Sequence, residues 1–436
     1  GSNPSPATKK MISYIRNFSS NISQIEKISF FLFAFLPISL ILGNLAINLN
    51  FILIAFAFLI DLKINKDYSF IKDKIFWLLL IFFFSLLPSL FFSINLENSL
   101  PRVLKILIII SFIVLIKKNI TNYKDKFERI IFGFWAIIFL FVTLDIILEI
   151  IFGYNIIEFY NNLIGYSENN EKVIKGRISG LFGDELVVGG FIGAFALIII
   201  SYLVKFKSNY KKIIIFSAIG LIILSFLIGE RSNFIKLFIS TIIILFFFIR
   251  FNFKYKIILS LLTILMLYIF FNYNSHAKNR YSYILDFFVK KDAIYNYLKD
   301  SQYGAHYDTA YKIYKDNKLF GVGLKNFRIE CNKEKYLNPE YERSIHRCAT
   351  HPHQIHFEIL SETGIFGYIS FLIFILISIY WSMKEYFRNR NIFQLVSIVY
   401  LFAFLIPILP SGSFFSTFYS SLFWINYAIM VSYIKK

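Results

Sequence analysis

The chain has 436 residues, of which 57% are hydrophobic and only 17% are charged, with 54 Phe and 28 Tyr. Soluble globular domains carry about 25% charged residues, so this composition excludes a single soluble domain, a disordered chain and a coiled coil and is that of an all-α polytopic membrane protein. The formal net charge of +19 does not indicate nucleic-acid binding, because Lys and Arg cluster between long apolar runs.

Residues 1–10 (GSNPSPATKK) precede Met11 and resemble a cleavage scar with a linker, so we expect no structural role for them. Apolar runs of about 20 residues, long enough to cross a bilayer as helices, recur after them. They predict nine spans within residues 11–272 and three within 362–436, separated by a long connection at 273–361. The predicted spans are 28–45, 47–62, 76–94, 103–116, 130–152, 182–204, 213–228, 234–250, 256–272, 362–382, 393–409 and 414–433.

Lys and Arg are distributed unevenly over the connections between these spans. One connection, 95–102, holds a single Arg, and another, 410–413, holds none. Cytoplasmic loops carry the excess of Lys and Arg, so we expect both termini to be cytoplasmic and residues 273–361 to face the opposite side. The basic connections are 63–74, 117–129, 205–212, 250–256 and 384–390.

The outward segment 273–361 holds all six histidines and both cysteines. Its pattern predicts a helical patch at Tyr307–Tyr314 and a turn at Gly321–Gly323. Cys331 and Cys348 would form a disulfide in an oxidising compartment, closing a loop worth about 3 kcal/mol. Two reduced thiols are the alternative; a zinc site is less favoured, because no C-x-x-C or H-E-x-x-H spacing is present.

Two arginines, Arg177 and Arg231, lie near the outward ends of the sixth and eighth spans. Ionisable residues at membrane depth are functional candidates, and the guanidinium fork suits a phosphate-bearing ligand. The alternative is that each anchors its helix at the lipid headgroups. Candidate supporting residues beside them are Asp184, Glu185, Glu230 and Lys236. Lys278, Arg280, Lys325 and Arg328 of the outward segment could attract an anionic ligand or form a solvated surface.

The stretch 350–367, THPHQIHFEILSETGIFG, leads from the outward segment into the tenth span. A neutral imidazole at the membrane boundary is a suitable general base near pH 7. His353 is our candidate for this role, with His351 as the alternative base and Gln354 as a supporting residue. Ordinary surface histidines are the other interpretation.

Four elements in this order resemble the O-antigen ligase and polymerase superfamily of bacterial envelope glycosyltransferases. They are RISGLFGDELVVGGF (177–191), GERSNFIKL (229–237), NKLFGVGLKNF (317–327), and His353-Gln354 followed by Glu362 and Gly364-Ile365-Phe366-Gly367. Three positions depart from the family pattern: Gln354 replaces the usual Asn, Lys318 replaces a Pro, and Glu230 stands where Ser is common.

The resemblance implies a GT-C-like helical bundle in the bacterial inner membrane, capped by a periplasmic loop. It implies transfer of a glycan from undecaprenyl diphosphate to an acceptor hydroxyl without metal or cofactor, with His353 as base and Arg177 and Arg231 holding the diphosphate. A polymerase, with a second lipid-linked glycan as acceptor, is slightly favoured over a ligase, which uses lipid A core. Membrane lipids and a chain-length regulator protein are further expected partners, and nucleic acid is not. The alternative from another class is a flippase or transporter of lipid-linked sugars, although the chain lacks the internal repeats typical of transporters.

Overall fold

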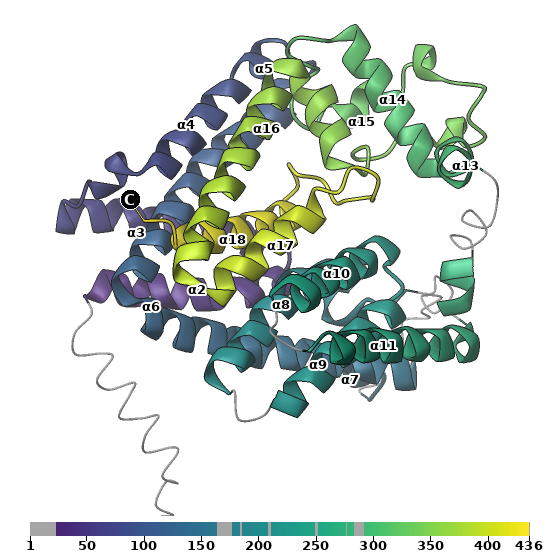
Figure 1. Ribbon diagram of the computed structural model, residues 1–436. Helices are drawn as coiled ribbons and strands as arrows, with labels where there is room; N and C mark the ends of the chain where they lie inside the picture. Colours follow the sequence, from purple (N-terminus) through teal and green to yellow (C-terminus); the bar gives the residue numbers. More distant parts are fainter. Residues whose placement is uncertain are drawn as a thin grey trace, which may run out of the picture.

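The computed structural model describes residues 23–163, 177–183, 185–207, 211–248, 252–275, 277–282 and 292–435. Every regular element within these ranges is helical (Figure 1). The first half comprises α2 (Gln24–Leu42), α3 (Asn44–Asn65), α4 (Lys74–Leu86), α5 (Pro88–Phe91), α6 (Leu96–Phe152), α7 (Ile156–Leu163) and α8 (Val188–Phe206). The second half comprises α9 (Lys211–Leu227), α10 (Arg231–Ile243), α11 (Phe253–Tyr273), α13 (Ala293–Asp300), α14 (Gln302–Asp316), α15 (Phe327–Glu330), α16 (Ile355–Asn389), α17 (Ile392–Phe404) and α18 (Phe418–Ser432).

The bundle is apolar outside as well as inside. Large apolar side chains such as Phe31, Phe56 and Tyr268 are more than half exposed, whereas nearly every residue of α18 is buried against α6, α8 and α17. A backbone in hydrocarbon must satisfy its own hydrogen bonds, which helices do. Eight of the described helices are long and apolar enough to cross a membrane. The expected all-α polytopic membrane protein is confirmed.

The connection predicted between the fourth and fifth spans, residues 117–129, lies inside α6, at a kink where two helices meet. Residues 117–129 are helical, and α6 departs from helical geometry only at Tyr123 (φ −134°, ψ 32°). This stretch contains neither Pro nor Gly, and the ammonium of Lys117 is neutralised by Asp73 at 2.7 Å, so its charge does not force the chain into solvent. At 57 residues and about 1.5 Å per residue, α6 is long enough for two crossings. Twelve crossings stay a prediction.

Residues 292–361 of the outward segment fold over one end of the bundle, and we call that end of the bundle the histidine side. Figure 1 shows α13, α14 and α15 gathered there, beside α5 and the start of α16. The expected turn at Gly321–Gly323 is present and is tied to α16, because Val322 N donates to Ser361 O (3.1 Å) and Gly323 N to Glu362 O (2.9 Å). A small core stabilises the segment: Ala310, Ile313, Val322, Phe327, Cys331 and Tyr336.

Helix α16 begins at Ile355, seven residues before the predicted span. The Gln354 side chain caps it, since Oε1 accepts from His356 N (2.6 Å) and Phe357 N (3.2 Å). The helix is interrupted at Gly364 (φ 66°, ψ −170°). The turns before Gly364 pack with the outward segment, and the turns after it lie in the bundle.

Candidate functional site

His353 is held in place through its backbone. It lies immediately before the Gln354 cap, has a left-handed φ of 56°, and its carbonyl oxygen accepts from Ser411 N at 2.7 Å. Non-glycine residues adopt such a φ only where the surrounding structure imposes it. The imidazole position is therefore set by α16 on one side and by the connection between α17 and α18 on the other.

Three aromatic rings surround the His353 imidazole. The ring centroids of His351, His306 and Tyr303 lie 4.1, 5.2 and 5.7 Å away. Within the described residues, neither ring nitrogen of His353 has a hydrogen-bond partner. His306 and His351 each engage Nδ1, with Arg347 O (2.8 Å) and Thr350 Oγ1 (3.0 Å).

His356 has a structural role, because both of its ring nitrogens are bound. Its Nε2 donates to Leu405 O (2.8 Å), and its Nδ1 accepts from the Tyr368 hydroxyl (3.2 Å). Among the described histidines near the start of α16, His353 has both ring nitrogens unengaged, whereas His351 has only a buried Nε2 without a partner.

Burial keeps these imidazoles neutral. The pKa of His353 is lowered to about 4, chiefly by burial and then by repulsion from His306 and Arg177. Burial also lowers the pKa of His351 well below its ordinary value, with His353 as the next cause. At neutral pH both rings carry a lone pair that can accept a proton.

Arg177 and Arg231 lie at neighbouring positions on the histidine side. Ile178 N donates to Ile228 O (3.2 Å), which holds the Arg177 segment beside the turn that leads into α10, and Arg231 is the first residue of that helix. Arg177 is close enough to repel a protonated His353. The fold thus brings the two arginines and the histidine together from three separate parts of the sequence.

Arg280 is a third arginine of this group, which the sequence placed only among general cations of the outward segment. Its carbonyl accepts from Arg231 Nη1 and its Nε donates to Gly229 O, both at 3.4 Å. Its Nη2 is enclosed and, within the described part of the chain, has no acceptor. Burial and then repulsion by Arg177 and Arg231 lower the pKa of Arg280 to about 10. Arg177, Arg231 and Arg280 therefore form a cluster of positive charge beside the Glu230 carboxyl, which we call the arginine trio.

The α17–α18 connection (405–417) joins the arginine trio to His353. Ser232 Oγ and Lys236 Nζ (2.9 Å), both on α10, donate to Pro410 O, and the next amide, Ser411 N, holds the His353 carbonyl. In sequence this connection was notable only for lacking Lys and Arg. Its Pro, Ser and Gly residues could have identified it as part of the site. They indicate irregular backbone, which among membrane helices occurs only where it is buried in protein or lines a cavity.

A buried polar cluster lies beneath this site. Glu362 accepts from Lys325 N (2.6 Å), and Glu358 accepts from Ser413 Oγ and from Phe414 N (2.7 Å). The Lys325 ammonium donates to Ser413 Oγ at 2.8 Å. Glu362, the acidic residue of the His353 motif, therefore acts as a clamp between the Gly321–Gly323 turn and α16.

The remaining predicted residues lie around the site rather than in it. Glu230 braces α8 against α10, since it accepts from Gly189 N (2.7 Å) and Asn233 Nδ2 (2.6 Å). Lys236 is buried below Arg231. Glu185 is exposed and lies 3.5 Å from Asn44 Nδ2, at the α2–α3 turn. Asp184 lies outside the described residues.

Cys331 and Cys348 form a disulfide, with Cα atoms 5.3 Å apart. It links the residue that follows α15 to the segment of chain that enters the site at Thr350. Within the described residues, no group of three or more His, Cys, Asp or Glu side chains could hold a metal ion.

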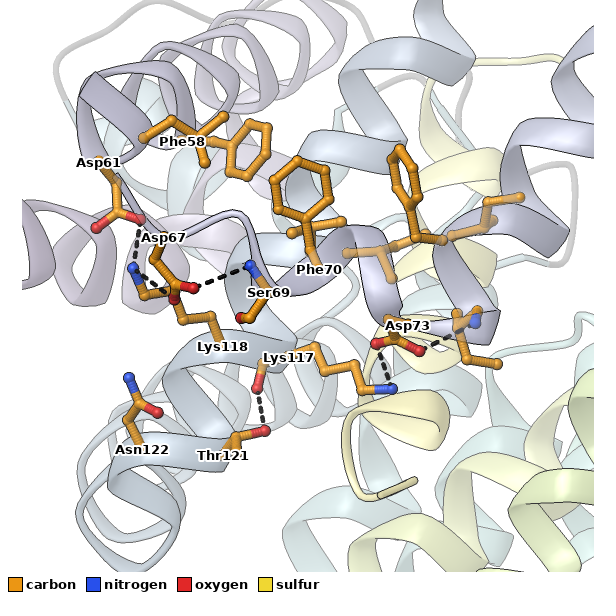
Figure 2. A pocket seen from close by; sticks show the side chains of 16 residues that line it. Phe58, Asp61, Asp67, Ser69, Phe70, Asp73, Lys117, Lys118, Thr121 and Asn122 are labelled. Atoms are coloured by element: carbon orange, nitrogen blue, oxygen red, sulfur yellow. Dashed lines mark hydrogen bonds and ion pairs between the residues drawn. The ribbon is translucent and has the colours of Figure 1, made fainter. Parts of the chain in front are cut away.

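A separate cavity of about 140 Å³ lies between α3, α4 and α6. Figure 2 shows that its two lysines reach from α6 to carboxylates: Lys117 to Asp73 (2.7 Å) and Lys118 to Asp61 (2.6 Å). Lys117 is about 30 Å along α6 from the histidine side. The two lysines of this cavity are paired with carboxylates, and the cavity takes no part in the site around His353.

Comparison with known proteins gives one family. Residues 216–372 match a family model described as O-antigen ligase. The match begins in α9 and ends in α16, so it contains Arg231, Arg280 and His353 but not Arg177. The match supports the resemblance to the O-antigen ligase and polymerase superfamily. It also supports the interpretation of the chain as a membrane enzyme of that type. No curated protein matches the chain.

Proposed function

We propose that this chain transfers a glycan from undecaprenyl diphosphate to a hydroxyl of an acceptor on the histidine side. The observation that carries the proposal is the position of His353, with both ring nitrogens unengaged, beside Arg177 of the arginine trio. A base next to a site for a doubly charged leaving group is what glycosyl transfer from a lipid diphosphate requires.

The acceptor hydroxyl attacks the anomeric carbon while its proton passes to a ring nitrogen of His353. The bond from that carbon to the diphosphate oxygen breaks, and the electron pair leaves with the diphosphate. The arginine trio offsets the negative charge that grows on this leaving group, and guanidinium forks are suited to do so because they bind phosphate oxygens in pairs.

Binding of the donor would raise the pKa of His353. The low pKa of His353 is due chiefly to burial, then to repulsion by His306, and last to repulsion by Arg177. A diphosphate bound at Arg177 would neutralise that repulsion and raise the pKa towards the working pH, where a general base is most effective. Donor binding would in this way activate His353.

Two acceptors remain in the proposal. Gln354 and Lys318 depart from the ligase pattern and favour the polymerase, in which a second lipid-linked glycan accepts. The description of the matching family favours the ligase, in which lipid A core accepts. In either case we place the reaction on the periplasmic face of the inner membrane, with both termini cytoplasmic. A chain-length regulator is an expected partner of the polymerase.

The test uses purified protein in nanodiscs with a lipid-linked repeat unit, alone or with lipid A core. A ladder of longer lipid-linked glycans indicates the polymerase, and glycosylated lipid A core the ligase. His353→Ala should abolish the product, whereas His351→Ala should retain it. No product in either tube from a well-folded protein would refute the proposed activity, and the reverse order of the two variants would move the base to His351.

A further inference from the structure

We infer a second anion site, formed by Arg102 and Arg328, that binds a phosphate group of the acceptor. The inference rests on the proposed transfer reaction and adds a binding site to it. It starts from the contact between the outward segment and the beginning of α6.

Hydrogen bonds place the 324–328 turn on the first turn of α6. Asn326 Nδ2 donates to Ser93 Oγ (2.8 Å) and to Ser99 Oγ (3.2 Å), and Ser99 Oγ donates to Leu324 O (2.9 Å). Arg102 follows Ser99 by one helical turn, and Arg328 follows Asn326 by two residues. The two guanidinium groups are close enough to repel each other.

The charge around them is not balanced. The pKa of the neighbouring Lys325 is lowered, first by burial; Glu358 and Glu362 oppose this effect, while Arg328 and Arg102 add to it. Both carboxylates already accept hydrogen bonds from backbone amides in the clamp. Two arginines and a lysine are therefore gathered around two carboxylates, of which Glu362 also acts on Arg102, so the cations outnumber the carboxylates by one.

Both arginines are available to a ligand. Among the described residues, the Arg102 guanidinium has no hydrogen-bond or ion-pair partner, and the Arg328 side chain is exposed, with one long bond from Nη2 to Thr350 O (3.4 Å). Two guanidinium groups with unused donors suit a phosphate or diphosphate, whose oxygens they bind in pairs.

The position of this pair relative to His353 assigns it to the acceptor. Arg328 contacts Thr350, and Thr350 Oγ1 lies 3.0 Å from His351 Nδ1. Arg177 approaches His353 from the arginine trio. Cationic groups thus lie near both ends of the 350–353 segment. One base between two anion sites suits a reaction in which both donor and acceptor carry phosphates, as a lipid-linked glycan and lipid A both do.

The test counts bound lipids by native mass spectrometry of the full chain in phosphatidylcholine nanodiscs. The probes are undecaprenyl diphosphate and bis-phosphorylated lipid A. The wild type should bind one copy of undecaprenyl diphosphate at the arginine trio and a second phosphate-bearing lipid at Arg102 and Arg328. Arg102→Gln/Arg328→Gln should weaken the second event by roughly tenfold or more and leave the first unchanged, which also shows that this variant is folded. Arg102→Lys/Arg328→Lys should retain part of the binding, and Arg343→Gln, at an exposed arginine of the same segment, should match the wild type.

The arms separate the possible outcomes. A second copy of undecaprenyl diphosphate that Arg102→Gln/Arg328→Gln removes identifies a lipid-linked acceptor, and lipid A lost in the same variant identifies lipid A core. If Arg177→Gln/Arg231→Gln leaves all binding intact while the second event still depends on Arg102 and Arg328, the proposed donor site fails and this inference stands. Equal binding of both probes to the wild type and to Arg102→Gln/Arg328→Gln, or no second event in the wild type, would overturn it.

Discussion

Replacing Gly364 with alanine should loosen the attachment of the outward segment to α16. Gly364 has φ 66° and ψ −170°, a conformation that residues with a side chain avoid. A Cβ atom there would lie 2.3 Å from Leu319 O, which is a backbone atom and cannot rotate away. The chain at Leu319 would have to move, and with it the turn that carries Gly321–Gly323.

The cost can be worked out from these contacts. The disfavoured conformation costs about 1–3 kcal/mol. Two hydrogen bonds join the same segments, Ile365 N to Lys318 O (2.8 Å) and Phe366 N to Leu319 O (3.3 Å). Each contributes about 0.5–1.5 kcal/mol and would weaken or break. We therefore expect Gly364→Ala to destabilise the protein by about 2–6 kcal/mol.

The assay is thermal unfolding in nanodiscs, together with limited proteolysis of the outward segment. The matched control is Gly220→Ala in α9, where an added Cβ would meet no atom within 4 Å and where alanine should be neutral or slightly stabilising. Gly364→Ala should melt at a clearly lower temperature and be cleaved faster in residues 317–320. Equal melting and equal cleavage of the two variants would refute the docking described above.

Three further predictions concern the site and its support. The value of kcat/KM should fall on acidification, as His353 becomes protonated near its lowered pKa of about 4. Arg177→Gln removes a repulsive charge, so the pH at which the remaining activity falls should be higher in this variant. An unchanged pH dependence would contradict the coupling between Arg177 and His353. Cys331→Ser should lower stability by about 3 kcal/mol through loss of the cross-link, measured by thermal unfolding against the unreduced wild type, and no change would mean that the disulfide does not constrain the segment. Lys325→Met should cost about 1.5–3 kcal/mol, because it removes the buried ammonium that donates to Ser413 Oγ and attracts the Glu358 carboxylate. The double variant Lys325→Met/Glu358→Gln should recover part of this loss; a double variant no more stable than the single one would show that the two residues are not coupled.

Much of the helical architecture follows from the sequence alone, because a run of about 20 apolar residues has few alternatives to a membrane helix. The connection at residues 117–129 is a kink between two helices, where a loop was expected. Lysines normally mark the ends of spans, but Lys117 pairs with Asp73, the N-cap of α4, and Lys118 pairs with Asp61 of α3, so the chain stays helical through them. Such pairing over long sequence separation is invisible to a local pattern.

The site was predictable to a similar extent. His353, Arg177 and Arg231 were named from sequence elements, and the fold brings them together; their chemical roles stay predictions. Arg280 was not placed with them, because nothing local distinguishes it from the other cations of the outward segment. Its position depends on the contacts with Arg231 and Gly229, which only the folded chain provides. Likewise, the hydrogen bond from Ser411 N to the His353 carbonyl joins residues far apart in sequence.

The central claim is that His353 removes a proton as the glycan leaves undecaprenyl diphosphate. The most direct measurement is the release of undecaprenyl diphosphate in a single turnover, with a lipid-linked repeat unit and a saturating acceptor. Three proteins should be compared: the wild type, His353→Ala, and His346→Ala as a control, since His346 is exposed on the same segment. We predict release by the wild type and by His346→Ala, and a loss of at least about a hundredfold with His353→Ala, the usual contribution of a general base. Release by His353→Ala at the wild-type rate would contradict the assignment.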